Sequence, residues 1–316
     1  MAQSSRETET THARGGAAPE LLPNLARIPP RAPRQARRTA KGRRGAPLKL
    51  RDLPPCFPPR TLLLSPPMPS RTFAIGDIHG DLDALHRLLA ALPPLDAGDT
   101  LVFVGDYLDR GPRSADVVAF LRALPSRTPA KVVLLRGNHE DGWLRVVDRG
   151  WPEFVIPAPN GCLATLRSFL GRPPPVEGEG MADDEVEPLF KGTFFPPDVV
   201  AWMRELPFWY EDDYAIYVHA ALPKGPEGYE HPSTTQRRLA MLWCRDHDFV
   251  RDYRGKLVIF GHTATKYLPP ELSEYTPEDK EDAWVGPCVI GIDTRCGKGG
   301  YLTCVELPSG QVYESR

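Results

Sequence analysis

The chain has 316 residues, of which 41% are hydrophobic and 25% are charged, and its formal net charge is −2. It contains no run of about 18 apolar residues, so we expect no membrane-spanning helix and no membrane partner. The composition is not that of a collagen or a coiled coil, and the length allows one or two domains with a sizeable core.

The near-zero net charge is the sum of two unlike segments. Residues 1–70 hold 13 basic and 4 acidic side chains, a net of +9, together with 13 of the 36 prolines. The other 246 residues hold 26 basic and 37 acidic side chains, a net of −11. The first segment has too little apolar surface to offset the entropy cost of ordering. We therefore predict a disordered, basic Pro/Arg-rich extension over residues 1–67 and a folded domain over residues 68–316.

Several interpretations of the basic extension stay open. Its basic cluster could bind nucleic acid or an acidic partner, and an Arg-rich, acid-poor start is also typical of a transit peptide. The favoured interpretation is a solvated tail without a specific partner, and translation that starts at Met68 is a further possibility. The apolar run 61–64 is too short for a secretory signal, so we expect a cytoplasmic protein. The basic cluster comprises Arg34, Arg37, Arg38, Lys41, Arg43 and Arg44.

The folded part begins with strands that alternate with helices. Short apolar segments predict strands at 72–75, 101–104 and 131–135, and leucines at helical spacing predict a helix over 82–92. Ser114 is the expected N-cap of a second helix. Alternating strands and helices indicate βαβ units and an α/β fold with a largely parallel inner sheet.

The second half of the chain is less regular. A Pro/Gly/acidic stretch, 171–187, predicts a mobile loop, and Pro196-Pro197-Asp198 predicts the start of a short helix. Further strands are predicted at 215–218, 257–260, 288–292, 301–306 and 312–314.

Polar residues that can bind metals follow most of the strands, usually beside a glycine. Ligands of open α/β sheets collect at the carboxyl ends of the strands, so these side chains should converge. Two Asp, three His and one Asn form a mixed oxygen and nitrogen set without thiolates, which suits Mn, Fe or Zn. Six ligands suit two ions that share one carboxylate, as in phosphoryl transfer. The eight strand-end residues are Asp77, His79, Asp106, Asp109, Asn138, His139, His219 and His262, and six of them make up this ligand set.

Three segments carry a family resemblance. Gly76-Asp77-Ile78-His79-Gly80, the stretch from Gly105 to Gly111 and Gly137-Asn138-His139-Glu140 resemble the signature motifs of the PPP-type serine/threonine phosphoprotein phosphatases, within the calcineurin-like metallophosphoesterases. The segments around His219 and His262 resemble the two later histidine motifs. The resemblance spans roughly residues 71–307 and is closest to the compact bacterial members. It implies two packed mixed β-sheets flanked by helices, and it makes residues 68–316 a metallophosphatase catalytic domain.

The resemblance also implies a role for each motif residue. Asp77 and His79 would bind the first metal ion, Asp106 would bridge both ions, and Asn138, His219 and His262 would bind the second. His139 would be the general acid and Asp109 would orient it. Arg110 would bind the substrate phosphate, with Arg245 in a looser motif as a second phosphate-binding arginine. We expect two manganese ions, with Fe and Zn as alternatives.

The implied activity is dephosphorylation of phosphoserine or phosphothreonine in proteins by a hydroxide that the two ions activate. A metal lowers the pKa of its bound water to about 7, so such a nucleophile exists at neutral pH. We expect a phosphoprotein substrate and no nucleic acid at the catalytic domain, while the tail leaves nucleic acid open. Asp293 is either a partner that orients a ligand histidine or a turn residue. Ala221 stands where many relatives have Gly, but it removes no ligand.

Two other functions compete. A symmetrical dinucleoside-tetraphosphate hydrolase has a related fold, but that group usually lacks the acid-orienting Asp and has Asp after the Asn-His pair. This chain keeps Asp109 and Glu140, which favours the phosphatase. A scaffold or binding protein that acts through the basic tail is the alternative of another class, and the intact ligand set argues against it.

Overall fold

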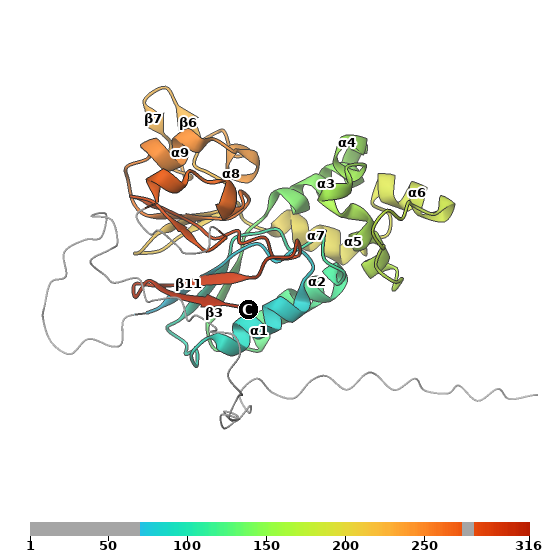
Figure 1. The fold of residues 1–316 in the computed structure, drawn as a ribbon, viewed down its shortest axis with the longest axis horizontal. Coiled ribbons are helices and arrows are strands. Elements are labelled where there is room, and N and C mark those ends of the chain that lie inside the picture. Colours follow the sequence, from blue (N-terminus) through green and yellow to red (C-terminus); the bar gives the residue numbers. More distant parts are fainter. Residues whose placement is uncertain (1–69, 274–280) are drawn as a thin grey trace, which may run out of the picture. The chain divides into compact units, whose positions relative to one another are not determined.

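The computed structural model describes residues 70–273 and 281–316 (Figure 1). The predicted extension over residues 1–67, its basic cluster and the boundary at Met68 lie outside the described residues. Within the described ranges, no helix is long and apolar enough to cross a membrane.

The first sheet has five strands in the order β12-β11-β1-β2-β3. Strands β1, β2 and β3 run parallel, while β11 pairs antiparallel with β1 and β12 pairs antiparallel with β11. Their bounds are β1 (Thr72–Ile75), β2 (Thr100–Phe103), β3 (Lys131–Leu134), β11 (Thr303–Leu307) and β12 (Gln311–Glu314). The predicted βαβ start of the chain therefore forms one mixed sheet.

The second sheet has five strands in the order β4-β5-β8-β10-β9, in which β5, β8 and β10 are parallel and the two edge strands are antiparallel. Its strands are β4 (Trp209–Glu211), β5 (Ile216–Val218), β8 (Val258–Phe260), β9 (Trp284–Val285) and β10 (Val289–Gly291). A small hairpin joins β6 (Lys224–Gly225) to β7 (Gly228–Tyr229).

The helices fall into three groups by the apolar cores they share. The first two are α1 (Leu82–Ala91) and α2 (Ser114–Ala123); a central group follows, and α8 (Ala240–Trp243) and α9 (His247–Asp252) are the last two. The central group comprises α3 (Asn138–Arg149), α4 (Pro152–Val155), α5 (Cys162–Phe169), α6 (Asp183–Lys191) and α7 (Pro197–Glu205). Short 3-10 turns are η3 (Leu124–Ser126), η4 (Ala158–Asn160), η5 (Thr265–Tyr267) and η6 (Pro270–Leu272).

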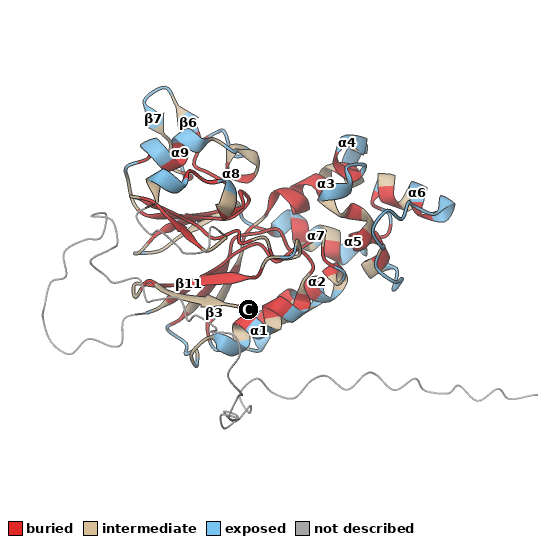
Figure 2. Ribbon diagram, in the orientation of Figure 1, coloured by how far each residue is buried: buried red, intermediate tan, exposed pale blue. Residues whose placement is uncertain are grey.

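The two sheets pack face to face. Alternate residues such as Val102 of β2 and Ile259 of β8 point into one shared apolar layer, as the period of two along a strand requires. The opposite face of the first sheet is covered by α1 and α2, and that of the second sheet by α8 and α9. Figure 2 shows that the strands are largely buried, while α1 keeps an exposed outer face. The predicted class, two packed mixed sheets flanked by helices, is confirmed.

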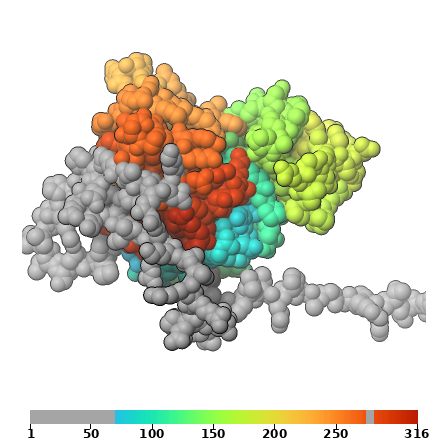
Figure 3. All heavy atoms as spheres, viewed as in Figure 1, coloured from blue at the N-terminus to red at the C-terminus, as the bar shows by residue number. Residues whose placement is uncertain are grey.

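The central helices form an apolar cluster of their own around Trp143 and Leu166. In Figure 3 the atoms of residues 150–190, green to yellow, lie beside the orange atoms of the second half of the chain. This cluster positions α3, whose first turn carries two of the predicted site residues.

Two local predictions were wrong. Ser114 is the first residue of α2 and not its N-cap, which is Arg113; the Ser114 hydroxyl instead accepts a hydrogen bond from the Asp109 N–H at 3.1 Å. The predicted loop 171–187 extends only to residue 182, because α6 begins at Asp183. Tertiary contacts of Glu185 hold this acidic helix in place. The helix predicted at Pro196–Asp198 is present as α7.

The side chains of Arg167 and Glu185 form a buried ion pair between α5 and α6, with 2.8 Å between Nε and Oε1. The hydrogen bond from Arg167 lowers the pKa of Glu185 to about 2. We predict that Glu185→Gln lowers the free energy of unfolding by about 2 kcal/mol at pH 7, because the buried guanidinium of Arg167 loses one of its two carboxylate partners and keeps only the more exposed Glu179. Urea unfolding measures this value.

The matched control is Glu187→Gln, on the same helix, where the carboxylate is exposed and pairs with Lys191. That change should cost no more than about 0.5 kcal/mol. The Glu185 contribution is complete above the ordinary pKa of about 4.5 and is lost as the pH falls through about 2. Equal losses in the two variants would contradict the assignment.

Candidate active site

The predicted ligands follow the carboxyl ends of strands in both sheets. Asp77 and His79 follow β1, Asp106 follows β2, and Asn138 is the first residue of α3 after β3. From the second sheet, His219 follows β5 and His262 follows β8. All six are buried, although polar side chains are rarely buried without partners. The fold therefore brings the ligands predicted from both halves of the chain to one buried site.

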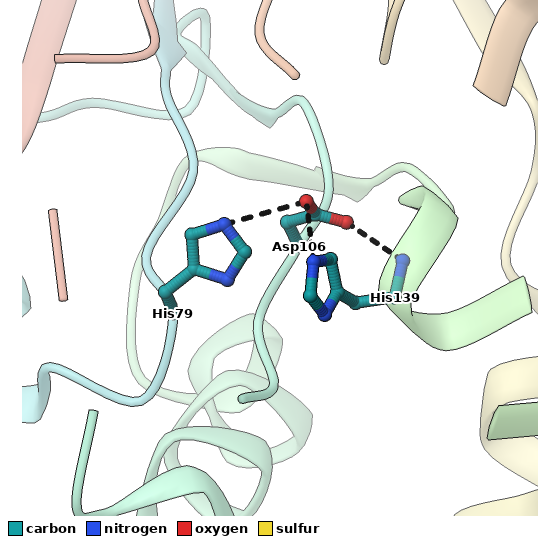
Figure 4. A group of neighbouring side chains, drawn as sticks. All are labelled: His79, Asp106 and His139. Carbon is teal, nitrogen blue, oxygen red and sulfur yellow. Dashed lines mark hydrogen bonds and ion pairs between the residues drawn. The ribbon is translucent and has the colours of Figure 1, made fainter. Parts of the chain in front are cut away.

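The carboxylate of Asp106 lies at the centre of this site. Its Oδ2 is 3.4 Å from His79 Nε2, and its Oδ1 is 3.3 Å from His219 Nε2. Figure 4 shows His79 and His139 on either side of this carboxylate. Asp106 belongs to two groups of possible metal ligands, one with His79 and His139 and one with His219 and His262. Its position between the two groups is compatible with the predicted bridging role.

Asn138 and Asp77 complete the set through other contacts. Asn138 Oδ1 is 2.8 Å from His262 Nδ1 and 3.0 Å from His219 Nε2. Asp77 Oδ2 accepts a hydrogen bond from the backbone N–H of His262 at 2.9 Å and lies 4.0 Å from His79 Nε2.

Backbone carbonyls set the protonation of two histidines. Nδ1 of His79 lies 2.9 Å from the Leu108 carbonyl, and Nδ1 of His219 lies 2.9 Å from the Val104 carbonyl. A carbonyl only accepts, so each Nδ1 carries the proton and each neutral Nε2 directs a lone pair at Asp106. This is the arrangement in which a protein histidine binds a metal.

The donor set fits bound cations. Oxygen and nitrogen acceptors of Asp106, Asn138 and His219 converge, and Asp77 Oδ1 and His262 Nε2 are buried without a hydrogen-bond partner among the described residues. Burial and the charges of Asp293 and Asp106 hold the pKa of Asp77 well above its usual range. Burial also lowers the pKa of His79 and of His262, so both favour the neutral, metal-binding form. Such a cluster is unfavourable alone and is stabilised by divalent ions.

His139 and Asp109 form a dyad beside the ligands. His139 Nδ1 lies 2.6 Å from Asp109 Oδ2, and its Nε2 faces the site, 3.9 Å from Asp106 Oδ2. The other Asp109 oxygen accepts hydrogen bonds from Trp143 Nε1 at 2.9 Å and from Thr165 Oγ1 at 2.6 Å. These donors fix the carboxylate, which in turn fixes the ring of His139.

The two predicted phosphate-binding arginines approach the site from different sides. The guanidinium of Arg110 contacts His79 Nε2, and its Nη2 is 3.3 Å from His139 Nε2. Arg245 is exposed and its Nη1 donates to the carbonyl of His262 at 3.1 Å. Both guanidinium groups therefore contact predicted site histidines, and groups of this kind bind phosphate oxygens.

The backbone is strained at this site. Among the described residues, six that are not glycine have a φ between 47° and 71°, and five of them belong to the predicted set. Each costs about 1–3 kcal/mol, and such residues concentrate at functional sites. The five are His79, Asp106, Asp109, Arg110 and His262.

The structure thus brings all ten predicted site residues to one region, and their individual roles stay predictions. Of the two interpretations of Asp293, its contacts favour the turn, because its Oδ1 accepts the Arg295 N–H at 2.9 Å. Sequence reasoning missed Trp143 and Thr165. Trp143 follows His139 by four residues on one helix, a spacing that places both side chains on the same helix face and could have predicted the contact. Nothing in the sequence around Thr165 links it to the site.

Comparison with known proteins decides the family. A sequence model of the family described as "Calcineurin-like phosphoesterase" matches residues 70–266, more than half of the chain. The chain belongs to the calcineurin-like phosphoesterase family. It is therefore a metallophosphoesterase, a hydrolase whose family uses divalent metal ions.

Relatives in this calcineurin-like family are named for different activities. The chain is 33% identical over 275 residues to a symmetrical bis(5'-nucleosyl)-tetraphosphatase of Dechloromonas aromatica, covering 77% of this chain and 95% of that one. It is 40% identical over 77 residues to the serine/threonine-protein phosphatase SIT4 of Candida albicans, 23% of this chain and 24% of that one. With Shewanella-like protein phosphatase 2 of Arabidopsis thaliana it shares 36% identity over 134 residues, 36% of this chain and 34% of that one.

Among solved structures, a putative diadenosine tetraphosphatase matches 79% of this chain and 95% of its own, with a TM-score of 0.49 and 24% identity.

Proposed function

We propose that this metallophosphoesterase is a phosphoprotein phosphatase that hydrolyses phosphoserine and phosphothreonine. In this proposal the six buried ligands hold two divalent ions, with manganese the expected metal and Fe or Zn the alternatives. Such ions would supply a hydroxide at neutral pH and offset the charge of the phosphoryl group. The chain itself provides the anion clamp and the proton donor.

Arg110 and Arg245 are the groups of the chain that would orient the substrate. Planar guanidinium groups bind phosphate oxygens in pairs, which fixes the phosphoryl group in place as well as neutralising it. Arg110 Nη2 lies 3.3 Å from His139 Nε2, so a phosphate bound by Arg110 would sit beside the proposed acid.

The hydrogen bond from His139 to Asp109 is the observation that carries the proposal. The serine or threonine alkoxide is a poor leaving group and needs a proton as the P–O bond breaks. A nucleotide released from a polyphosphate chain is a stable anion and needs the proton far less. The 2.6 Å contact holds Nδ1 on Asp109 and directs Nε2 to the site. A general acid that is held in place in this way supports a reaction with an alkoxide leaving group, as in a phosphoserine or phosphothreonine substrate.

A second candidate is symmetrical hydrolysis of a dinucleoside tetraphosphate. One observation favours it: the relative that matches 95% of its own length is named for that activity, while the named protein phosphatases match 24% and 34% of theirs. This function would need the metal ligands and the arginine clamp, and it would make little use of the His139–Asp109 dyad.

The test is phosphate release from phosphoserine and phosphothreonine peptides by the full chain after removal of metals and titration with manganese. We expect saturable hydrolysis that a chelator abolishes and manganese restores. Hydrolysis of p-nitrophenyl phosphate without release of phosphate from either peptide would overturn the proposal.

A further inference from the structure

We propose that Lys298 binds a second negatively charged group of the substrate, so that the enzyme prefers phosphopeptides with an acidic residue next to the phosphorylated one. This inference rests on the proposed function and names the substrate class of the same site. It assigns a binding role to a residue that lies outside the three signature segments and both histidine motifs.

Lys298 lies on a cavity that starts at the phosphate-binding side of the active site. The cavity has a volume of about 730 Å³, and Arg110, Arg295 and Lys298 contribute its basic lining. None of the six predicted metal ligands lines it. The cavity therefore runs from Arg110 away from the metal ligands, where the rest of a bound substrate would lie.

The walls of the cavity are not uniform in charge. Apolar side chains of residues 155–164, Val176 and Met181 line much of it, and Glu177 and Glu179 lie on its lining too. Glu179 is paired with Arg167. Glu177 would repel an acidic group of a substrate, whereas Arg110, Arg295 and Lys298, the basic end of the cavity, would attract it. The charges would therefore orient a bound substrate in the cavity.

Lys298 has the free positive charge at that basic end. Arg295 Nη1 is bound to Glu281 Oε1 at 2.6 Å, and its Nη2 donates to the Lys298 carbonyl at 3.1 Å. Among the residues that the structure describes, the ammonium of Lys298 makes no hydrogen bond or ion pair. Its backbone is fixed by the hydrogen bond from its N–H to the Arg295 carbonyl at 2.9 Å.

The loop that carries Lys298 is built to approach the active site closely. A Cβ on Gly297, whose φ is +72°, would clash with the carbonyl oxygen of His79. Arg295, with a φ of 65°, is the sixth of the strained positions and the one outside the predicted set. Glycine is needed for this close approach of the backbone. The next residue is Lys298, and its side chain shares the cavity with Arg110, the predicted phosphate-binding residue.

The charge of Lys298 is destabilised in the substrate-free site. Burial and the positive charges of Arg110 and Arg245 lower its pKa to about 8. In the proposed function, two arginines and two metal ions would already face the phosphate that is hydrolysed. A further half-buried cation near them is unfavourable unless an anion binds it, and the cavity offers room for that anion outside the phosphate site.

The experiment compares two phosphoserine peptides that differ only in Glu or Gln next to the phosphoserine. We expect wild type to show a KM about fivefold to tenfold lower for the Glu peptide, as one charge-assisted hydrogen bond would give. Lys298→Met should remove the difference by raising that KM, with kcat unchanged, and Lys298→Arg should keep it. Lys131→Met is the control, because Lys131 starts β3 at the end of the strand away from the site.

Binding is also measured as competitive inhibition of p-nitrophenyl phosphate hydrolysis, so the test does not require that the peptides be hydrolysed. If the peptides inhibit without being cleaved, the proposed function fails while the ratio of their inhibition constants still decides the role of Lys298. Equal constants for the two peptides in wild type would overturn the inference. So would Lys298→Met raising the KM of both peptides and of p-nitrophenyl phosphate alike, because Lys298 would then bind the hydrolysed phosphate itself.

Discussion

Replacing His139 with Asn is expected to lower kcat on a phosphoserine peptide by about 10²–10⁴-fold, the usual contribution of a general acid. The same variant should keep its rate on p-nitrophenyl phosphate within about tenfold of wild type. The reason is the leaving group: p-nitrophenolate is a stable anion, whereas the serine alkoxide needs the proton of His139 Nε2. Steady-state kinetics on both substrates, with manganese saturating, measure the ratio.

Asp109→Asn provides the matched variant for this prediction. The Asn oxygen can still accept from Trp143 Nε1 and Thr165 Oγ1, which both donate to Asp109 Oδ1. Its NH2 group then faces His139 Nδ1, which in the wild type donates to Oδ2, so the orientation of His139 would be lost without removing the ring. We expect the same selective loss on the peptide, smaller than in His139→Asn. An equal loss on both substrates would instead make His139 a metal ligand, a role that its place beside His79 and Asp106 allows.

Replacing Asp106 with Asn is expected to abolish hydrolysis of every substrate. Asp106 faces His79 at 3.4 Å and His219 at 3.3 Å, so its carboxylate would bridge both metal positions. Removing a residue that only hydrogen-bonds to a metal ligand already lowers metal affinity by about 10–100-fold. Loss of the bridging carboxylate should therefore lower manganese affinity by at least about 100-fold. Isothermal titration with manganese measures the affinity apart from activity.

The fold should survive this change. Asp106 Oδ1 accepts the His139 N–H at 3.0 Å, and an Asn oxygen of the same size can do the same. The metal-free variant should therefore still fold. Its unfolding temperature should lie at or somewhat below that of wild type, because His219, His139, His79 and Arg110 hold the pKa of Asp106 below its usual range despite burial, so the folded state stabilises this carboxylate. Asp83→Asn, on the exposed face of α1, is the control. Wild-type manganese affinity in Asp106→Asn would contradict the bridging role.

Much of the fold and the site could be predicted because the signals are local. Short apolar segments mark the inner strands, and polar residues beside glycines follow them at strand ends where ligands collect. That rule alone places Asp77, Asp106 and His219 near one another, although His219 lies more than a hundred residues beyond the first two. The motif resemblance then attaches a role to each.

The features that were missed depend on contacts between distant segments. Thr165 is 56 residues from Asp109 and carries no motif, yet it donates to that carboxylate. The helix α6 has an acidic start and an internal proline, a composition typical of loops, and the buried contact between Arg167 and Glu185 outweighs that preference. Lys298 sits in no recognised segment, and only the approach of Gly297 to His79 brings it to the site.

The most direct test of the central claim is the ratio of kcat/KM for a phosphoserine peptide and for a dinucleoside tetraphosphate, measured on one manganese-loaded preparation of the full chain. A phosphatase with a built acid at His139 should favour the peptide by at least about tenfold, since each tenfold in rate reflects about 1.4 kcal/mol of transition-state stabilisation. A ratio that favours the tetraphosphate, with two nucleoside diphosphates as products, would contradict the account.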